Sequence, residues 1–259
     1  MATGKARLDH VGKVAVLTLD DSATRNALSW DMACDMNEAM DGIGDARALV
    51  LTGAGKGFCS GGDLGQGSED RAFGELVEEG LRETVNPMLR RIADLDLPVI
   101  SAVNGAAAGA GAPLALSADF TIAGESAFFL FAFPKVGLAL DAGASWLMPR
   151  LVGQARAMQA LMLAERIPAQ QALEWGMIYK VVPDEQLADS ALELAAQLAE
   201  GPTRSYAEIR KAVRAAQHAT YSDALDLEMA AQGRAGNTED CKEAVSAFLE
   251  KRAPVFKGR

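Results

Sequence analysis

One carboxylate lies alone in an apolar stretch of the sequence. Residues 136–146 read VGLALDAGASW, and Asp141 is the only charged residue between Lys135 and Arg150. A carboxyl group among apolar neighbours has a raised pKa and is suited to general base or acid chemistry. An Asp before a glycine is also a good helix N-cap, because its oxygen accepts backbone N–H groups. This stretch alone leaves both roles open.

Two glycine-rich turns could supply the groups that such a carboxylate would work with. The first, LTGAGKGFCSGGDL at 51–64, has five glycines that allow backbone N–H groups to approach a ligand, but it matches neither a P-loop nor GxGxxG. The second, AVNGAAAGAGAPL at 102–114, could aim helix N-terminal amides at a developing oxyanion. Close packing explains either turn equally well. Together with Asp141, they predict a site that polarises a carbonyl and moves a proton.

Alternating strands and helices are expected to position these turns. Runs rich in Val, Ile and Leu predict strands at 13–20, 46–53, 98–103, 119–124 and 177–182. A helix is expected at 29–43 behind a Ser29 cap, and a short helix between the third and fourth strands. The repeated strand–helix–strand order is typical of an α/β fold.

The C-terminal third is expected to be helical. Helical spacing recurs at 184–200, 202–217, 222–235 and 238–251, and 177–182 is the one strand expected after about residue 154. Residues 65–95 begin with Gly and Ser and continue as a charged helix. That segment could be a flap over a site, although a plain solvated helix explains it more simply.

The composition excludes several classes of function. A net charge of -10 and a pI near 4.8 disfavour nonspecific binding to nucleic acid or anionic lipid. Neither an export signal nor a run of about 18 apolar residues is visible, so we expect a cytoplasmic protein outside the membrane. Cys34, Cys59 and Cys241 form no disulfide or metal pattern. His10 and His218 lack neighbours at metal-ligand spacing, so we expect ordinary packed or surface histidines and no metal site.

The motifs resemble one family over essentially the whole chain. GKGFCSGGDL, PVISAVNGAAAGAG, ADFTIAGESAFF, PKVGLALDAGASWLMPRLVG, EWGMIYKVV and SAFLEKRAPVFKGR are together similar to the crotonase, or enoyl-CoA hydratase/isomerase, superfamily. The resemblance implies a spiral of ββα turns over residues 1–195 and a C-terminal helical trimerisation region over 196–259. It also implies a homotrimer or a dimer of trimers.

The resemblance assigns roles around Asp141. The backbone N–H groups of Gly62 and Ala110 would form an oxyanion hole for the thioester oxygen of an acyl-CoA. The two glutamates of the hydratases match Pro113 and Phe133 here. Asp141 matches an aspartate that several isomerases, and the hydrolytic aryl-CoA dehalogenases, require. One carboxylate suits a 1,3-proton shift, in which a single base removes a proton and returns it elsewhere.

Further residues would bind the substrate, according to the same resemblance. CoA would lie along Ser60, Gly62, Asp63 and Leu64, with Ala110 opposite and Arg25 as a phosphate candidate. Phe256 and Lys257 would reach the adenosine moiety held by a neighbouring subunit. Phe129, Phe131 and Phe133 share one face of a strand and could line an acyl pocket with Pro113, although core packing explains these rings equally well. No cofactor is implied, because CoA enters as part of the substrate.

The motif combination looks most like the branch of the family that isomerises the ring epoxide of phenylacetyl-CoA, 2-(1,2-epoxy-1,2-dihydrophenyl)acetyl-CoA, to an oxepin. That branch also shifts 3-enoyl-CoA to 2-enoyl-CoA. Enoyl-CoA hydratase activity in fatty-acid or aromatic degradation is the alternative. An aspartate-nucleophile dehalogenase ranks lower, because it needs a base to activate water and the central motifs contain no histidine. The acidic charge opposes a non-catalytic RNA-binding role, and the oxyanion turns do not favour a purely CoA-binding one.

Overall fold

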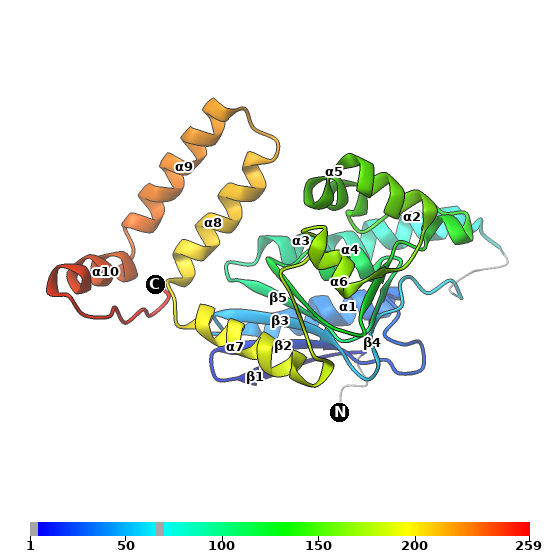
Figure 1. The fold of residues 1–259 in the computed structure, drawn as a ribbon, viewed down its shortest axis with the longest axis horizontal. Coiled ribbons are helices and arrows are strands. Elements are labelled where there is room, and N and C mark those ends of the chain that lie inside the picture. The colour runs from blue at the N-terminus through cyan, green and yellow to red at the C-terminus, as the bar shows by residue number, and fades with distance from the viewer. Residues whose placement is uncertain (1–4, 66–69) are drawn as a thin grey trace.

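A computed structural model describes residues 5–65 and 70–259 of the chain (Figure 1). Its larger sheet has the order β1-β2-β3-β5-β7-β10. The strands are β1 (Ala6–Val11), β2 (Val14–Leu19), β3 (Ala48–Gly53), β5 (Val99–Val103), β7 (Phe120–Gly124) and β10 (Lys180–Val182). Only β1 runs antiparallel to its neighbour, and the other pairs are parallel. The central strands β3, β5 and β7 are buried along nearly their whole length, because helices cover both faces of a parallel sheet. The five expected strands are confirmed, the last of them only over Lys180–Val182.

A second, smaller sheet repeats the winding of the first. It has the order β4-β6-β8-β9 and consists of β4 (Gly57–Cys59), β6 (Ala106–Ala108), β8 (Phe128–Leu130) and β9 (Ile167–Pro168). Each of β3, β5 and β7 is followed by one of these short strands and then by a helical segment. The chain is therefore wound in the expected ββα turns.

Helices cover both faces of the larger sheet. α1 (Trp30–Ala39) begins behind Ser29, whose hydroxyl accepts a hydrogen bond from the Met32 amide at 3.1 Å, and continues as a 3-10 turn, Met40–Ile43. The remaining core helices are α2 (Phe73–Gly80), α3 (Asn86–Asp94), α4 (Gly111–Leu116), α5 (Ala144–Leu163), α6 (Ala169–Glu174) and α7 (Leu187–Ala199). A π-helical turn, Leu81–Val85, joins α2 to α3. Residues 66–69, which belong to the 65–95 segment considered above as a flap, lie outside the described residues.

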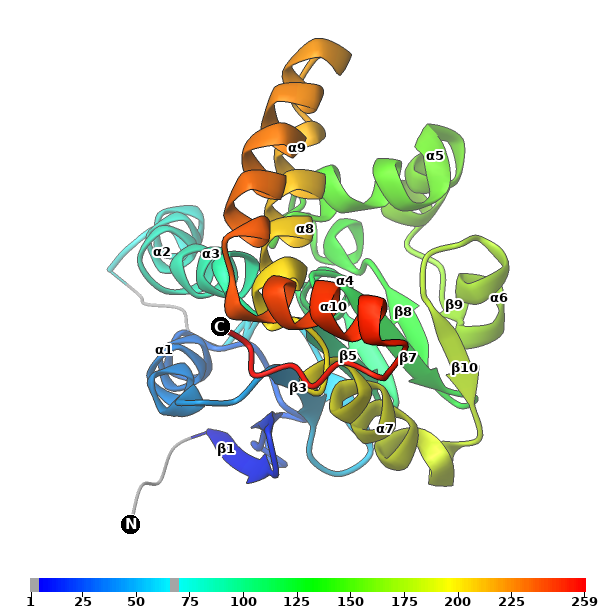
Figure 2. The same cartoon turned by 90° about the vertical axis from the view of Figure 1, so that its left-hand side faces the viewer.

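The C-terminal helices project from this body. α8 (Thr203–Ala216) and α9 (Tyr221–Gly236) form a hairpin that extends away from the sheets, and α10 (Glu239–Glu250) lies near the start of α8 (Figures 1 and 2). These helices were expected. The division expected between residues 195 and 196 falls inside α7, which packs on β3 and β5 of the sheet. The part that projects therefore begins with α8.

The last residues return to the sheet. The Arg47 guanidinium, directly before β3, donates hydrogen bonds to the Phe256 carbonyl at 3.0 Å and to Thr203 Oγ1 at 2.8 Å. The buried Asp240 carboxylate accepts from the amides of Lys257 at 2.6 Å and Gly258 at 2.8 Å. The C-terminal segment is thus fixed at the start of β3. Within the described ranges, no helix combines the length and apolar character needed to cross a membrane.

Candidate active site

Three residues that are distant in the sequence line one small cavity. Gly62 follows β4, Ala110 precedes α4 and Asp141 precedes α5, and all three line a cavity of about 40 Å³. The remaining lining residues are Leu28, Trp30, Asp63, Leu64, Phe73, Leu76, Val77, Leu81, Val85 and Leu138. The cavity therefore brings together the carboxylate and both glycine-rich turns.

The Asp141 carboxylate faces this cavity without a compensating partner. Its Oδ1 atom is buried and has no hydrogen-bond partner in the described part of the chain. Burial raises the pKa of Asp141 from 3.8 to about 6, because an apolar environment disfavours the ionised form. The raised pKa expected from the sequence is confirmed in direction.

The alternative role of Asp141 as a helix cap is wrong. α5 begins at Ala144, its cap residue is Gly143, and no side chain caps it. Asp141 contributes only its backbone carbonyl, which accepts from the Ala144 amide at 3.0 Å. The intervening Ala142 has a φ of 49°, a left-handed conformation that costs an alanine roughly 1 kcal/mol. This turn keeps the carboxylate away from the free amides of the helix.

The two amide-bearing turns pack against each other through their backbones. Gly61 has a φ of +98°, and a Cβ atom there would lie 2.8 Å from the Ala108 carbonyl oxygen. Within residues 5–65 and 70–259, neither the Gly62 amide nor the Ala110 amide donates to a backbone carbonyl. Two N–H groups thus remain available on residues that line the cavity. Unpaired amides of this kind can stabilise a developing oxyanion.

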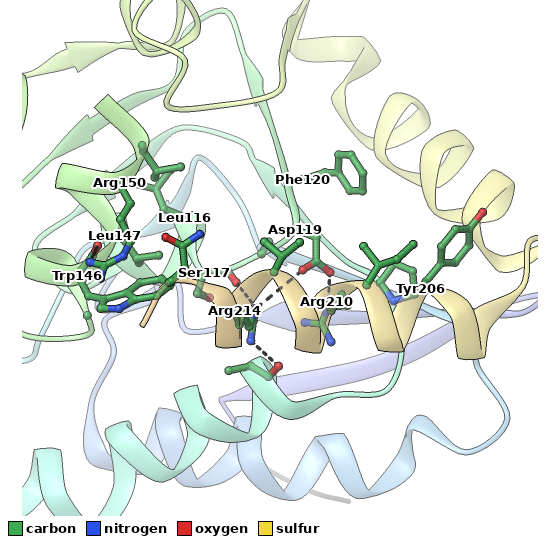
Figure 3. A pocket seen from close by; sticks show the side chains of 18 of the residues that line it. Leu116, Ser117, Asp119, Phe120, Trp146, Leu147, Arg150, Tyr206, Arg210 and Arg214 are labelled. Atoms are coloured by element: carbon green, nitrogen blue, oxygen red, sulfur yellow. Dashed lines mark hydrogen bonds and ion pairs between the residues drawn. The ribbon is translucent and has the colours of Figure 1, made fainter. Parts of the chain in front are cut away.

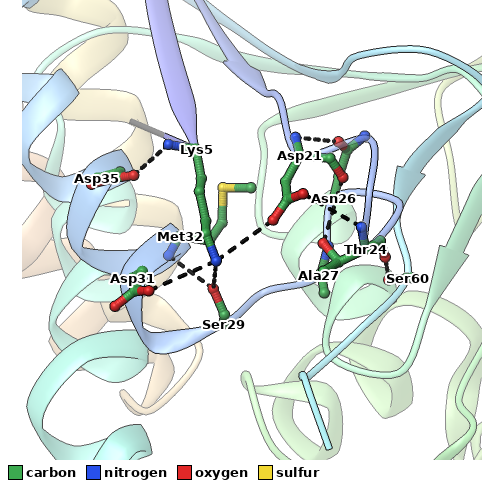
Figure 4. A network of polar contacts seen from close by, with 10 residues as sticks. All are labelled: Lys5, Asp21, Thr24, Asn26, Ala27, Ser29, Asp31, Met32, Asp35 and Ser60. Atoms are coloured by element: carbon green, nitrogen blue, oxygen red, sulfur yellow. Dashed lines mark hydrogen bonds and ion pairs between the residues drawn. The ribbon is translucent and has the colours of Figure 1, made fainter. Parts of the chain in front are cut away.

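The segment expected to hold CoA lies beside the Arg25 turn. The Ser60 amide donates to the Arg25 carbonyl at 3.2 Å, and Ser60 Oγ donates to the Thr24 carbonyl at 2.8 Å. The buried Asn26, with a φ of 60°, holds this turn by donating from Nδ2 to the carbonyls of Ala54 and Gly57, both at 2.9 Å. Its Oδ1 accepts a hydrogen bond from the Asp21 amide at 2.9 Å (Figure 4). Arg25 itself is exposed. The structure therefore brings Arg25 and the 60–64 segment together at the surface.

Asp63 and Leu64 complete that segment. Asp63 Oδ1 accepts a hydrogen bond from the Gly65 amide at 2.9 Å, so this second carboxylate of the cavity lining already has a partner. The Leu64 side chain is 52% exposed. An exposed leucine at the rim of a cavity is suited to contact a ligand.

The proposed acyl-pocket phenylalanines lie elsewhere. Phe129 and Phe131 are 0% exposed, Phe133 is 4% exposed, and Pro113 is buried within α4. None of the four is among the residues that line the described cavity. The expectation that the three rings share one face of a strand is wrong, because only Phe129 lies in β8, Phe131 follows that strand and Phe133 begins a 3-10 turn; all three rings belong to the core.

The sequence analysis missed the residues that do form the apolar wall. They come from the start of α1, from α2 and from the π-helical turn, and they are Trp30, Phe73, Leu76, Val77, Leu81 and Val85. The charged helix at 65–95 was the one available signal, because its apolar face had to cover something. Phe256 and Lys257 lie at the start of β3, away from the cavity of the same chain.

A larger groove of about 760 Å³ lies between α5 and α8 (Figure 3). Two of its arginines face one carboxylate: Arg210 Nε lies 2.6 Å from Asp119 Oδ2, and Arg214 lies 3.8 Å from the other carboxylate oxygen. His218 also lines it, and its Nε2 accepts from Trp146 Nε1 at 3.1 Å. Across the described residues, no group of three His, Cys, Asp or Glu side chains is arranged to hold a metal ion.

Two free amides and one buried carboxylate around a cavity are the groups that an enzyme needs to polarise a carbonyl and move a proton. Residues 9–259 match the family described as enoyl-CoA hydratase/isomerase. The chain belongs to this family, the crotonase family.

Its relatives carry both hydratase and isomerase names. It is 47% identical to the "Probable enoyl-CoA hydratase" of Rhodobacter capsulatus, over 95% of each chain. It is 45% identical to the 1,2-epoxyphenylacetyl-CoA isomerase of Escherichia coli, over 97% of this chain and 98% of that one. Among solved structures, an enoyl-CoA hydratase from Polaromonas is 33% identical with a TM-score of 0.92, and the match covers 98% of this chain and 100% of that one.

Proposed function

We propose that the protein is an acyl-CoA isomerase that uses Asp141 as its one proton-transferring group. The observation that carries this proposal is the buried, unpartnered Oδ1 of Asp141 beside the Gly62 and Ala110 amides. The substrates are 2-(1,2-epoxy-1,2-dihydrophenyl)acetyl-CoA, converted to the oxepin, and 3-enoyl-CoA, converted to 2-enoyl-CoA. The similarity to the E. coli epoxide isomerase supports this choice of substrates.

In the 3-enoyl reaction, the amides of Gly62 and Ala110 donate to the thioester oxygen. The Asp141 carboxylate removes a proton from C2, and the electron pair moves into the thioester to give a dienolate that the two amides stabilise. The protonated Asp141 then returns the proton to C4, which leaves the double bond between C2 and C3. With a pKa of about 6, Asp141 is mostly ionised at pH 7 and is still a competent acid after the first step.

Enoyl-CoA hydration is the second candidate, supported by the R. capsulatus relative. Adding water across a double bond is simplest with one group that activates water and another that protonates C2. Pro113 and Phe133 are buried core residues without acid groups, and Asp63 is bonded to the Gly65 amide. Hydration would therefore have to use Asp63, the other acid of the described cavity lining, as its second group.

One preparation tests both candidates. We expect isomerisation of 3-hexenoyl-CoA and turnover of the aromatic epoxide to be at least tenfold faster than hydration of crotonyl-CoA, with no added metal or redox cofactor. A hydration rate equal to or above both isomerisation rates would overturn the isomerase proposal in favour of the hydratase.

The active form is a homotrimer or a dimer of trimers in this proposal. Apolar side chains are exposed on α8, α9 and α10, among them Ile209, Met229 and Phe248, which are 58%, 68% and 82% exposed. Exposed apolar area of this extent favours burial against another copy of the chain. In such an assembly Phe256 and Lys257 would reach the CoA bound by a neighbour. Light scattering of the purified protein measures the assembly size, and a monomer would contradict it.

We place the enzyme in the cytoplasm. Cys34, Cys59 and Cys241 are free thiols, which suits a reducing compartment. Fractionation of the source cells would test this placement.

A further inference from the structure

A tryptophan ring forms the bulkiest part of the cavity wall and rests on a glycine. Trp30 is the first residue of α1, and Gly80 is the last residue of α2. A Cβ atom at Gly80 would lie 2.4 Å from Cε2, 2.5 Å from Cζ2 and 2.6 Å from Cδ2 of the Trp30 ring. Three fused-ring atoms at nearly equal distances mean that the ring presents its face to Gly80. No residue larger than glycine fits there while the ring keeps its position.

The helix beneath the ring departs from regular geometry at the same place. Glycine is unfavourable within a helical run such as Phe73–Asp94, and here it is followed at once by the π-helical turn Leu81–Val85. Thr84 Oγ1 donates to the Gly80 carbonyl at 2.7 Å, which satisfies an acceptor that the wider turn displaces. π-helical turns are frequent at functional sites. The glycine within the helical run and the π-helical turn after it are both explained if the Trp30 ring has to keep its position.

We propose that Trp30, seated on Gly80, limits the size of the acyl group that the enzyme accepts. The inference deepens the proposed function and rests on it. The cavity of about 40 Å³ has room for only a few water molecules, at roughly 10–15 Å³ for each, so a bound acyl group must displace part of the wall. Trp30 is the largest side chain of that wall and is fixed from behind. The preferred substrates are therefore thioesters of short or single-ring apolar acyl groups, and long chains are rejected.

A chain-length series tests this proposal. We expect Trp30→Ala to raise the ratio of kcat/KM for 3-dodecenoyl-CoA over 3-hexenoyl-CoA by at least about tenfold, since a few methylenes in an apolar pocket discriminate by that much. Gly80→Ala should lower kcat/KM for the aromatic epoxide and for the longer chains about tenfold, because the new methyl group pushes the ring into the cavity. Gly74→Ala is the matched control in the same helix, since a Cβ there meets nothing within 4 Å.

The double variant separates seating of the ring from general damage to the helix. If Gly80 acts through the ring, Gly80→Ala should have little effect in a Trp30→Ala background. An equal loss with and without the ring would overturn the seating role, and an unchanged chain-length ratio in Trp30→Ala would overturn the size limit. Circular dichroism checks whether Trp30→Ala folds. If it does not fold, Trp30→Leu is used in its place.

A binding measurement keeps this test independent of turnover. Calorimetry with hexanoyl-CoA and dodecanoyl-CoA, which do not react, should show the same change of preference in Trp30→Ala. If wild type binds neither ester and turns over no acyl-CoA, the proposed function fails. If it binds and turns over short esters but Trp30→Ala keeps the wild-type preference in both assays, only the size limit fails.

Discussion

The groove between α5 and α8 and the cavity at Asp141 differ in whether their buried charged side chains have partners. The groove between α5 and α8 is the larger, at about 760 Å³, and its buried Arg210 is paired with Asp119 at 2.6 Å. The cavity at Asp141 is about 40 Å³, and its carboxylate oxygen has no partner in the described residues. Buried polar groups are normally hydrogen-bonded, and among the few buried side-chain atoms of the described residues that are not, only Asp141 Oδ1 belongs to a carboxylate and lines this cavity. Size alone would have pointed to the wrong hollow.

The largest effect that this comparison predicts is on turnover at the cavity. Asp141→Asn keeps the shape of the side chain and removes the base, so we expect kcat to fall about 10³-fold or more, in the range of general base catalysis. Affinity for a non-reacting acyl-CoA should change by less than about threefold, since the amides and the apolar wall remain. Stopped assays with 3-hexenoyl-CoA and calorimetry with hexanoyl-CoA measure the two quantities. Turnover near that of wild type would remove Asp141 from the mechanism.

The groove should respond in the opposite way. Asp119→Asn leaves the Arg210 side chain, which is 6% exposed, without its ion partner, and breaking a buried pair costs about 3 kcal/mol of folding free energy. We expect urea unfolding to show a loss of that order while kcat of the remaining folded enzyme stays within about twofold. A loss of turnover without a loss of stability would mean that the groove, too, carries chemistry.

Some elements of the fold could be predicted from the sequence and others could not. The strands of the larger sheet and the helix behind Ser29 follow from local patterns of apolar residues and a cap, and both were predictable. The short strands β4, β6, β8 and β9 have two or three residues each, which is too few for periodicity to show. β1 was missed because four of its six side chains are exposed and three of the six are polar.

The candidate site divides in the same way. Asp141, Gly62 and Ala110 stand in distinctive stretches, so composition and resemblance were enough to single them out. Trp30 opens a helix that looks like any amphipathic helix, and its partner Gly80 lies fifty positions later in a charged one. Contacts of that range are set by tertiary packing, and a single sequence carries no local trace of them.

A third prediction concerns the stability cost of the unpartnered carboxylate. Its folded pKa of about 6 lies above the value of 3.8 for a free Asp, so the folded state holds the proton more tightly than the unfolded state. Stability from this group is therefore full below about pH 4 and is lost as pH rises through 6. Asp141→Asn should raise the unfolding free energy by about 2 kcal/mol at pH 7 to 8 and by almost nothing near pH 4. Urea unfolding at the two pH values measures this, and an equal gain at both would mean that the ionised carboxylate costs nothing.

The smallest effect is expected for Lys257, near the C-terminus, which the proposed function places beside the CoA bound by a second copy of the chain. The Lys257 side chain is exposed, while its amide is held by Asp240 at 2.6 Å, so Lys257→Ala removes a charge without loosening the C-terminal segment. Deleting residues 254–259 would be a poorer test, because it would remove the Phe256 carbonyl from Arg47 and both amide donors from the buried Asp240 carboxylate. If Lys257 reaches the CoA of a neighbour, its loss should weaken acyl-CoA binding about three- to tenfold, the value of one partly screened charge, and less at high salt. Lys242→Ala, which removes an exposed lysine from α10, is the matched control. Equal affinities for wild type and Lys257→Ala at low salt would confine the site to a single chain, and the cavity at Asp141 would then have to bind CoA through Arg25 and the 60–64 segment alone.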